Sequence, residues 1–234
     1  MSLAGLLNIL DGDPQLRDVL ARAGTGPDAA STEPAGTDLV APPALRPVLA
    51  AALARGVRGN GQPTRDGTGF VLAVTATARE AEDLAAGLGS FLPPDSVAFF
   101  PGWETLPHER LSPRSDTVGQ RLAVLRRLAH PAGPGEPNGP LTVVVTPVRS
   151  LLQPIVAGLG DLEPVMLQVG QDCELDDLLV RLVEIGYTRA DMVGSRGEIA
   201  VRGGIVDVFP PTEEHPLRIE FFGDTIEEIR YFKV

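Results

Sequence analysis

The chain has 234 residues, room for one large domain or two of ordinary size, and its 43% hydrophobic content can supply their cores. A formal net charge of −11 disfavours unaided binding to nucleic acid or to an anionic membrane, because neutralising phosphates requires clustered cations. The lone Cys173 excludes an internal disulfide, and no apolar run approaches the ~20 residues that a membrane span requires. We therefore expect a cytoplasmic protein of two domains, with a protein partner and no membrane contact.

Residues 1–158 predict an α/β domain with a parallel sheet. The expected elements are, in chain order, two short helices over residues 2–22, a loop over 24–43 with a short strand near 39–40, a helix over 45–54, a polar turn region over 59–69, and strands over 70–74, 97–100 and 141–145, each followed by a helix. Asp116 is the expected N-cap of the second of these last helices, and Thr146 with Pro147 begins the third, which runs to Ile155. Strands without polar alternation, separated by helices, are typical of a parallel sheet covered on both faces.

Residues 159–234 predict a smaller α+β domain. A strand over 164–169 precedes a helix that follows Asp172 and ends at Gly186. The expected apolar stripe of that helix is Leu175, Leu178, Leu179, Leu182 and Val183. Short strands follow, joined by tight turns at 203–204 and 223–224, which indicates an antiparallel sheet.

The stretch from Arg196 to Phe222 carries an unusual side-chain pattern. Alternation puts Leu217, Ile219 and Phe221 on one side of a strand, as for a core, and Arg218, Glu220 and Phe222 on the other. Arg202 lies on the corresponding side of an upstream strand. Arginine and phenylalanine are residue types that anchor protein interfaces, whereas cross-strand pairs on a half-exposed sheet have the same composition. Both readings are open at this point.

No enzymatic site can be assembled from the sequence. A phosphate-binding loop needs glycines and a lysine, yet Lys233 is the only lysine, and the corresponding stretch VAPPALRPVLAAAL has prolines where backbone N–H donors are needed. The three histidines, His108, His130 and His215, are far apart in sequence and are expected at the surface. Trp103 either anchors a ligand or packs beneath its proline-rich turn.

Three motifs carry a resemblance to a known family. They are PGWETLP at 101–107 with Ser112-Pro113 and Ser115-Asp116, Gly186-Tyr187 with Gly197-Glu198, and RGGIVDVFP at 202–210 continuing into RIEFFGD at 218–224. In these motifs the chain resembles the N-terminal part of the Mfd family, the bacterial transcription-repair coupling factors, whose first domains are similar to the excision-repair protein UvrB. The resemblance runs from about Leu45 onward, and the preceding residues match only loosely.

The resemblance implies a division of roles. The first domain would be half of a helicase core that has lost its nucleotide motif, and the second would dock UvrA through the family's binding positions, which fall on Arg202, Arg218 and Phe222. Glu220, between the last two, would either orient the arginine or meet a cation of the partner. UvrB itself has an intact phosphate loop and a long β-hairpin that clamps damaged DNA, and this sequence has neither.

We accordingly expect a non-catalytic fragment without cofactor or metal. ATP and Mg²⁺ would be used by a DNA translocase in the rest of the parent protein, and RNA polymerase and DNA would contact its other domains. The alternative is a helicase-like domain that binds nucleotide or damaged DNA itself.

Overall fold

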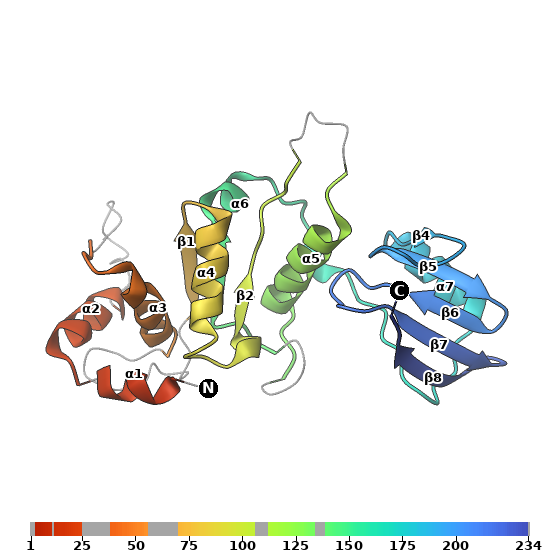
Figure 1. Ribbon diagram of the computed structural model, residues 1–234, viewed down its shortest axis with the longest axis horizontal. Helices are drawn as coiled ribbons and strands as arrows, with labels where there is room; N and C mark the ends of the chain where they lie inside the picture. The colour runs from red at the N-terminus through yellow and green to blue at the C-terminus, as the bar shows by residue number, and fades with distance from the viewer. Residues whose placement is uncertain are drawn as a thin grey trace. The chain divides into compact units, whose positions relative to one another are not determined.

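The computed structural model describes residues 3–10, 12–24, 38–55, 70–105, 112–133 and 139–233 (Figure 1). The chain divides into two compact units, one drawn from Met1–Gly102 and Val124–Val156 and the other from Trp103–Ala123 and Ala157–Val234. The domain boundary expected between residues 158 and 159 stays a prediction. The turn region over 59–69, most of the loop over 24–43, and His108 lie outside the described residues.

The first unit begins with helices where apolar spacing predicts them. They are α1 (Ala4–Leu10), α2 (Pro14–Gly24), the short 3-10 helix η1 (Pro43–Leu45), α3 (Arg46–Ala54) and α4 (Ala78–Leu88). The Asp13 carboxylate accepts hydrogen bonds from the Gln15 and Leu16 amides and so caps the start of α2. Thr77 and Glu80 form a capping box at the start of α4, which fixes where that helix begins.

A three-stranded parallel sheet forms the centre of this unit, as expected. Its strands β1 (Val71–Thr75), β2 (Val97–Phe99, preceded by the 3-10 helix η2, Pro94–Ser96) and β3 (Val143–Pro147) lie in the order β1-β3-β2. One face packs against α1, α3 and α4, with the buried residues Leu7, Ala50, Ala51, Ala54, Ala81, Leu88, Val143 and Val145. The small alanines of α3 allow that helix to approach the strands closely.

The second face of this sheet is covered over part of its width. Val124 of α5 (Ser115–Ala129) is buried with Phe100, Leu141 and Val144 in a separate core cluster. On the edge strand β1, by contrast, Leu72 and Val74 are 48% and 47% exposed. The prediction of a sheet covered on both faces is therefore correct for β3 and wrong for β1.

Three local predictions in this unit are wrong. The start of the helix after β3 is displaced by one residue: Thr146 and Pro147 both pair within β3, Pro147 rather than Thr146 is the N-cap, and the buried Thr146 hydroxyl donates to the Phe100 carbonyl, 2.9 Å away. Helix α6 therefore starts later, at Val148, and ends at Leu152 rather than Ile155. Residues 38–42 form no strand, since no neighbouring strand pairs with them in the described chain.

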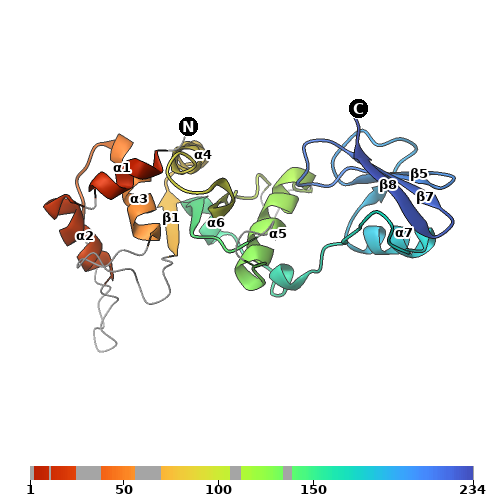
Figure 2. The ribbon, with the colours of Figure 1, turned by 90° about the horizontal axis from the view of Figure 1, so that it is seen from below.

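The second unit contains a five-stranded sheet, the helix α7 (Leu175–Glu184), the 3-10 helix η3 (Leu159–Asp161) and the N-terminal part of α5. The strands are β4 (Thr188–Arg189), β5 (Glu198–Arg202), β6 (Ile205–Val208), β7 (Leu217–Phe222) and β8 (Thr225–Tyr231), in that spatial order. The pairs from β5 to β8 are antiparallel, as predicted, whereas the short β4 runs parallel to β5. Figure 2 shows α7 lying along one side of this sheet.

The core of the second unit lies between α7 and the sheet. It contains Leu178, Leu179, Leu182, Ile199, Val206, Val208, Ile219 and Ile226. Gly203, with φ +60°, and Gly223, with φ +61°, supply the left-handed turn conformations of the two hairpins. Gly204 is needed for a different reason, because a Cβ there would lie 2.9 Å from the Phe221 carbonyl oxygen. The two predicted turns are confirmed.

Three expectations for this unit fail. Residues 164–169 form no strand, although Val165 and Leu167 still pack against the core. Val183 is 48% exposed instead of lying on the buried stripe of α7, which is narrower than its leucine spacing suggests. Asp116 is not the N-cap of α5 but lies in its first turn, where its carboxylate accepts from the Thr117 amide.

The N-terminal half of α5 is held by the PGWETLP segment and by the loop after β6. The Glu104 carboxylate accepts from the Arg114 amide at 2.9 Å and from the Thr117 hydroxyl at 3.1 Å. Trp103 packs face-on against the guanidinium of the buried Arg121, with 4.2 Å between Cζ and the ring centroid. Trp103 therefore packs within the fold, the second of the two roles considered for it.

Gly119, in the middle of α5, permits a close contact with Pro211. A Cβ at position 119 would lie 2.4 Å from the Pro211 Cβ. We predict that Gly119→Ala destabilises the second unit by about 1–3 kcal/mol, because overpacking outweighs the ~1 kcal/mol that alanine gains in a helix interior. Urea unfolding followed by the fluorescence of Trp103, the single tryptophan, measures this.

Gly194→Ala is the matched control, since a Cβ there meets nothing closer than a Glu198 carboxylate oxygen at 3.9 Å. We expect this control to change stability by less than about 0.5 kcal/mol. If the Gly119→Ala protein is as stable as the unaltered chain, the backbone around Pro211 can move to accommodate the added Cβ without loss of stability, and the prediction is wrong.

Candidate functional site

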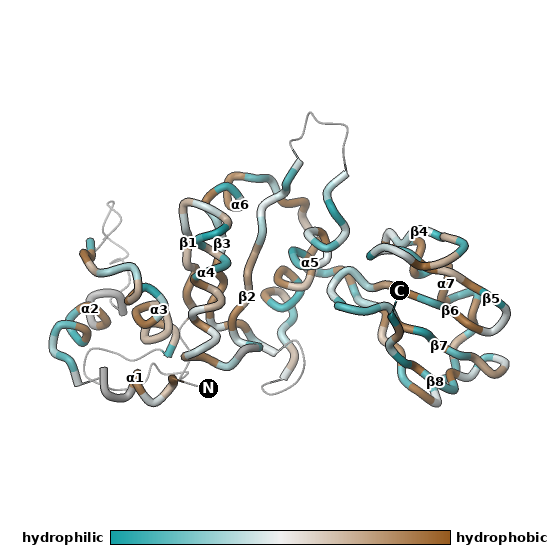
Figure 3. The backbone as a smooth tube through the Cα atoms, in the orientation of Figure 1, coloured by the Kyte–Doolittle hydropathy of each residue, from teal (hydrophilic) through white to brown (hydrophobic). Residues whose placement is uncertain are grey.

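The side of the five-stranded sheet opposite α7 is polar, and we call it the outer face. Strand register places its residues in two rows across the sheet, followed by one further residue at the end of β7. The rows are Ala200, Asp207, Arg218 and Arg230, then Arg202, Ile205, Glu220 and Glu228, and the further residue is Phe222. Figure 3 shows the resulting alternation of hydrophilic and hydrophobic residues along β7 and β8. Alternation therefore placed Arg202, Arg218, Glu220 and Phe222 on the correct side.

Arg218 is fixed on this face by two contacts within the chain. Its Nε and Nη2 donate to Oδ1 and Oδ2 of Asp207, each at 2.7 Å, in a two-pronged ion pair. The ring of Phe232 lies 5.0 Å from its Cζ. The hydrogen bond with Asp207 raises the pKa of Arg218, so its charge is retained at every working pH.

Glu220 pairs with an arginine that the sequence did not single out. Its Oε1 accepts from Arg230 Nη2 at 2.6 Å, while Arg230 Nε lies 3.3 Å from Oε2 of Glu228. One of the two roles considered for Glu220 is to orient Arg218. The hydrogen bonds that orient Arg218 are instead those that it donates to Asp207. Contact between Glu220 and a cation of a partner stays a prediction.

Arg202 and Phe222 are the most accessible of the predicted site residues. Phe222 is 75% exposed, which is unusual for so large an apolar side chain. The exposed Arg202 donates from Nη2 to the Asp191 carbonyl at 3.3 Å, and no described carboxylate lies within ion-pair distance of it. Both residues lie toward the same end of the sheet, because Arg202 pairs with Ile205 and the adjacent Gly204 meets Phe221.

The opposite end of the outer face is covered by the chain itself. Glu198 Oε2 accepts hydrogen bonds from the Gly194 and Ser195 amides, both at 2.8 Å, so the loop before β5 folds back onto this strand. Ala200, on the same strand, is 4% exposed. Arg202 and Phe222 are exposed at the other end of the face, and the side chains of Arg230 and Glu228 on β8 are 46% and 54% exposed, compared with 33% for Arg218.

A cluster around Glu213 orders the long connection between β6 and β7. Its carboxylate accepts from the Tyr231 hydroxyl at 3.1 Å, and its carbonyl accepts from Arg196 Nε at 3.0 Å. The guanidinium of Arg196 also lies over the ring of Phe209, 5.2 Å from its centroid. Burial, and next the charge of Glu213, raises the pKa of Tyr187 to about 12, and the hydrogen bond to Glu213 raises the pKa of Tyr231.

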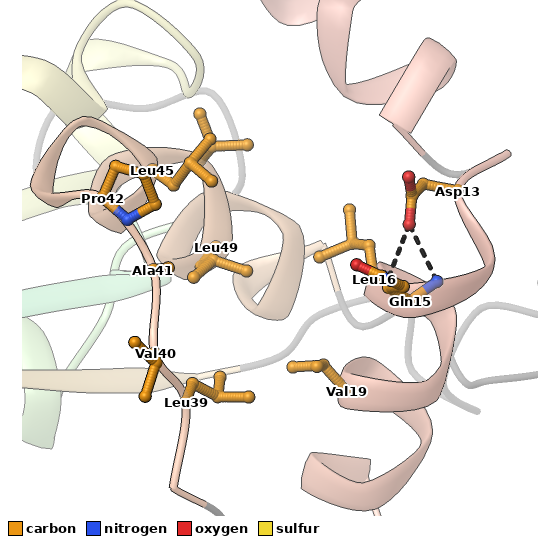
Figure 4. Close-up of a pocket in the computed structure, with 11 residues that line it drawn as sticks. Asp13, Gln15, Leu16, Val19, Leu39, Val40, Ala41, Pro42, Leu45 and Leu49 are labelled. Atoms are coloured by element: carbon orange, nitrogen blue, oxygen red, sulfur yellow. Dashed lines mark hydrogen bonds between the residues drawn. The ribbon is translucent and has the colours of Figure 1, made fainter.

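The stretch that occupies the place of a phosphate-binding loop borders an apolar cavity instead. This cavity, of about 430 Å³, lies between α2 and the segment leading into α3 (Figure 4). Leu16 and Val19 of α2 face Leu39 and Leu49 across it, and Asp13 is the one ionisable group among the described lining residues. The Asp13 carboxylate is negative and already caps α2, so the lining offers no cation to a phosphate.

Other sequence expectations concern the surface. His130 and His215 are exposed, as predicted. Among the described residues, no group of three or more His, Cys, Asp and Glu side chains is arranged to hold a metal ion. No described helix is long and apolar enough to cross a membrane.

Sequence reasoning missed the residues that hold the outer face together, namely Asp207, Arg230 and Phe232. Asp207 alternates with the core residues Val206 and Val208, which marks its side of the strand. Its partner, however, depends on the register between β6 and β7, and a connection of eight residues between them leaves that register unspecified in the sequence.

Comparison with known proteins places the outer face within a described family domain. A family profile described as the UvrB interaction domain matches residues 165–234, which include α7 and all five strands of the sheet. The chain is 51% identical over 232 residues to the transcription-repair-coupling factors of Mycobacterium bovis and Mycobacterium tuberculosis, a match that covers 99% of this chain and 17% of each relative. The chain is related to the N-terminal region of transcription-repair-coupling factors.

More distant relatives carry the same description. The transcription-repair-coupling factor of Bacillus subtilis is 36% identical over 165 residues, covering 69% of this chain and 13% of the relative. That of Escherichia coli is 34% identical over 133 residues, covering 56% of this chain and 11% of the relative. The chain thus spans less than a fifth of the length of these transcription-repair-coupling factors, and its outer face lies within the UvrB interaction domain.

Both tyrosines of the chain lie in the UvrB interaction domain, so their ionisation reports on it. A tyrosine that ionises near pH 10 when unfolded and near pH 12 when folded favours the folded state less as the pH rises between these values. We predict that stability falls over this interval and that ultraviolet titration of the folded chain shows tyrosinate only above the value for the urea-unfolded chain. Tyr187→Phe should remove the later-titrating group; titration of both tyrosines near pH 10 in the folded chain would contradict the burial of Tyr187.

We also predict that Mg²⁺–ATP leaves the melting temperature of the chain unchanged, because the lining of the α2–α3 cavity carries no cation. A ligand at 100 times its dissociation constant would stabilise the folded state by about 2.7 kcal/mol, which thermal-shift titration detects readily. A saturable upward shift would establish a nucleotide site that the residues around the cavity do not suggest.

Proposed function

We propose that this chain is a non-catalytic module that recruits UvrA, and thereby couples stalled transcription to nucleotide excision repair. Arg202, Arg218 and Phe222 on the outer face would form its UvrA-binding site, with Glu220 as an auxiliary interface residue. The observation that carries the proposal is the 75% exposure of Phe222 on the same face as Arg202 and Arg218, within the part of the chain that matches the UvrB interaction domain. Large rings and guanidinium groups are the side chains that most often dominate protein interfaces.

The energetics of the outer face support docking of a folded partner. Phe222 offers a large apolar area whose burial is favourable, and a ring loses little conformational freedom when it is buried. The guanidinium of Arg202 makes one hydrogen bond within the described chain, a long one to the Asp191 carbonyl, so most of its N–H donors are available to a partner. An apolar anchor flanked by cations fits a partner surface with a hydrophobic pocket next to a carboxylate.

The remaining roles are assigned to the parent protein. We place ATP and Mg²⁺ use, DNA translocation and contact with RNA polymerase in its other domains, and the whole protein in the cytoplasm. The first unit of this chain would be a scaffold derived from a helicase core. Support for that role comes from the prolines of the 40–53 stretch and from the apolar cavity that it borders, whose described lining carries no cation.

The proposal predicts a specific loss of UvrA binding. In calorimetry with purified UvrA, Phe222→Ala and Arg202→Ala should each raise the dissociation constant about 10-fold or more, because each removes an anchor from the accessible end of the face. Both side chains are exposed, so the melting temperature should stay within the error of the unaltered chain.

Val180→Ala and Arg181→Ala are the matched controls, since these exposed residues lie on α7, on the other side of the sheet. They should leave the affinity unchanged. Equal affinities for all four variants and the unaltered chain would move the UvrA site elsewhere, and no binding by the unaltered chain would refute recruitment itself.

A further inference from the structure

The two arginines of the proposed docking site are held differently. Arg218 gives two of its three guanidinium nitrogens, Nε and Nη2, to Asp207. Arg202 has a single hydrogen bond to a carbonyl oxygen among the described residues, and that bond is 3.3 Å long. The side chain of Asp207 is 13% exposed and that of Arg218 is 33% exposed, so the pair is shielded more than an ordinary surface ion pair.

The contacts of Arg218 constrain both its position and its plane. A two-pronged carboxylate fixes the edge of the guanidinium, because both N–H···O bonds require the two groups to be nearly coplanar. Phe232, directly after the end of β8, places its ring centroid 5.0 Å from Cζ of Arg218. The side chain is thus ordered before any partner arrives, and binding need not order it again.

The neighbouring carboxylates Glu220 and Glu228 are hydrogen-bonded or ion-paired to Arg230 rather than to Arg218. The pKa of Arg218 is raised first by its hydrogen bond with Asp207, and the charge of Glu220 also contributes to raising it. Asp207 is the carboxylate bonded to Arg218 on the described outer face. Asp207 also has no part in the core, since it points away from the side on which Val206 and Val208 are buried. Among the described residues, the hydrogen bonds of the Asp207 carboxylate are therefore those that it accepts from Arg218.

We propose that Asp207 is a positioning residue of the docking site: it fixes Arg218 so that Nη1 remains as the donor for the partner. This inference rests on the proposed UvrA-binding function. Asp207 would act only through Arg218, with Phe232 assisting, and would not itself have to touch the partner. Arg202, without such a carboxylate, would be ordered by the partner during binding.

A double-mutant cycle tests this role, with calorimetry of the whole chain against purified UvrA. Asp207→Asn keeps the size of the side chain and removes its charge, and we expect it to raise the dissociation constant about fivefold or more. In an Arg218→Gln background the same change should have no further effect, within about twofold. Glu228→Gln, which removes an outer-face carboxylate not bonded to Arg218, is the matched control and should leave the affinity unchanged.

Each other outcome overturns the inference. Asp207→Asn with unaltered affinity would mean that Arg218 needs no positioning, and an equal loss in both backgrounds would mean that Asp207 supports the fold or touches the partner. If Asp207→Asn fails to fold, Phe232→Leu takes its place, with the same expected dependence on Arg218. Absence of binding by the unaltered chain would instead refute the proposed function, so the two failures are distinguishable.

Discussion

The five-stranded sheet is packed by a helix on one side only, and the properties of the second unit follow from that constraint. The leucines of α7 bury Ile199, Val206, Ile219 and Ile226, and a strand must then direct every second residue to the other side. An unpacked sheet face cannot be apolar throughout without inviting association, and here it carries six charged residues. Ala200, Ile205 and Phe222 are the apolar residues of this face, and Phe222, a large ring that is 75% exposed, is what distinguishes it from an ordinary solvated surface.

The charges of this face are arranged as ion pairs rather than scattered. Asp207 neutralises Arg218, and Glu220 with Glu228 surrounds Arg230, which leaves Arg202 without a carboxylate among the described residues. The chain as a whole carries a net charge of −11, yet the accessible end of the outer face presents a cation and a ring. Net charge therefore argues against nucleic acid as a ligand of this chain without determining the local potential where a protein docks.

Residues 100–104, which include most of the described part of the PGWETLP segment, have structural roles. Thr146 and Ser150 both direct their hydroxyls at the Phe100 carbonyl, and a Cβ at Gly102 would lie 3.2 Å from Ser150 Oγ. Trp103 lies against Arg121, and Glu104 accepts the hydrogen bonds that the start of α5 offers. Gly102, Trp103 and Glu104 thus have roles in packing and in capping α5.

The sequence by itself determined the periodic features: the helices, the parallel strands, the hairpin turns at their glycines, and the side of β7 on which Arg218, Glu220 and Phe222 lie. These depend on local spacing, which a residue's neighbours in the chain define. Only the tertiary structure decided which side chains meet, namely Asp207 with Arg218, Arg230 with Glu220, and Pro211 with Gly119. It also decided that residues 164–169 pack without pairing and that Thr146 stays in its strand. Those outcomes depend on the register between strands and on contacts across loops, and no local pattern in the sequence specifies either.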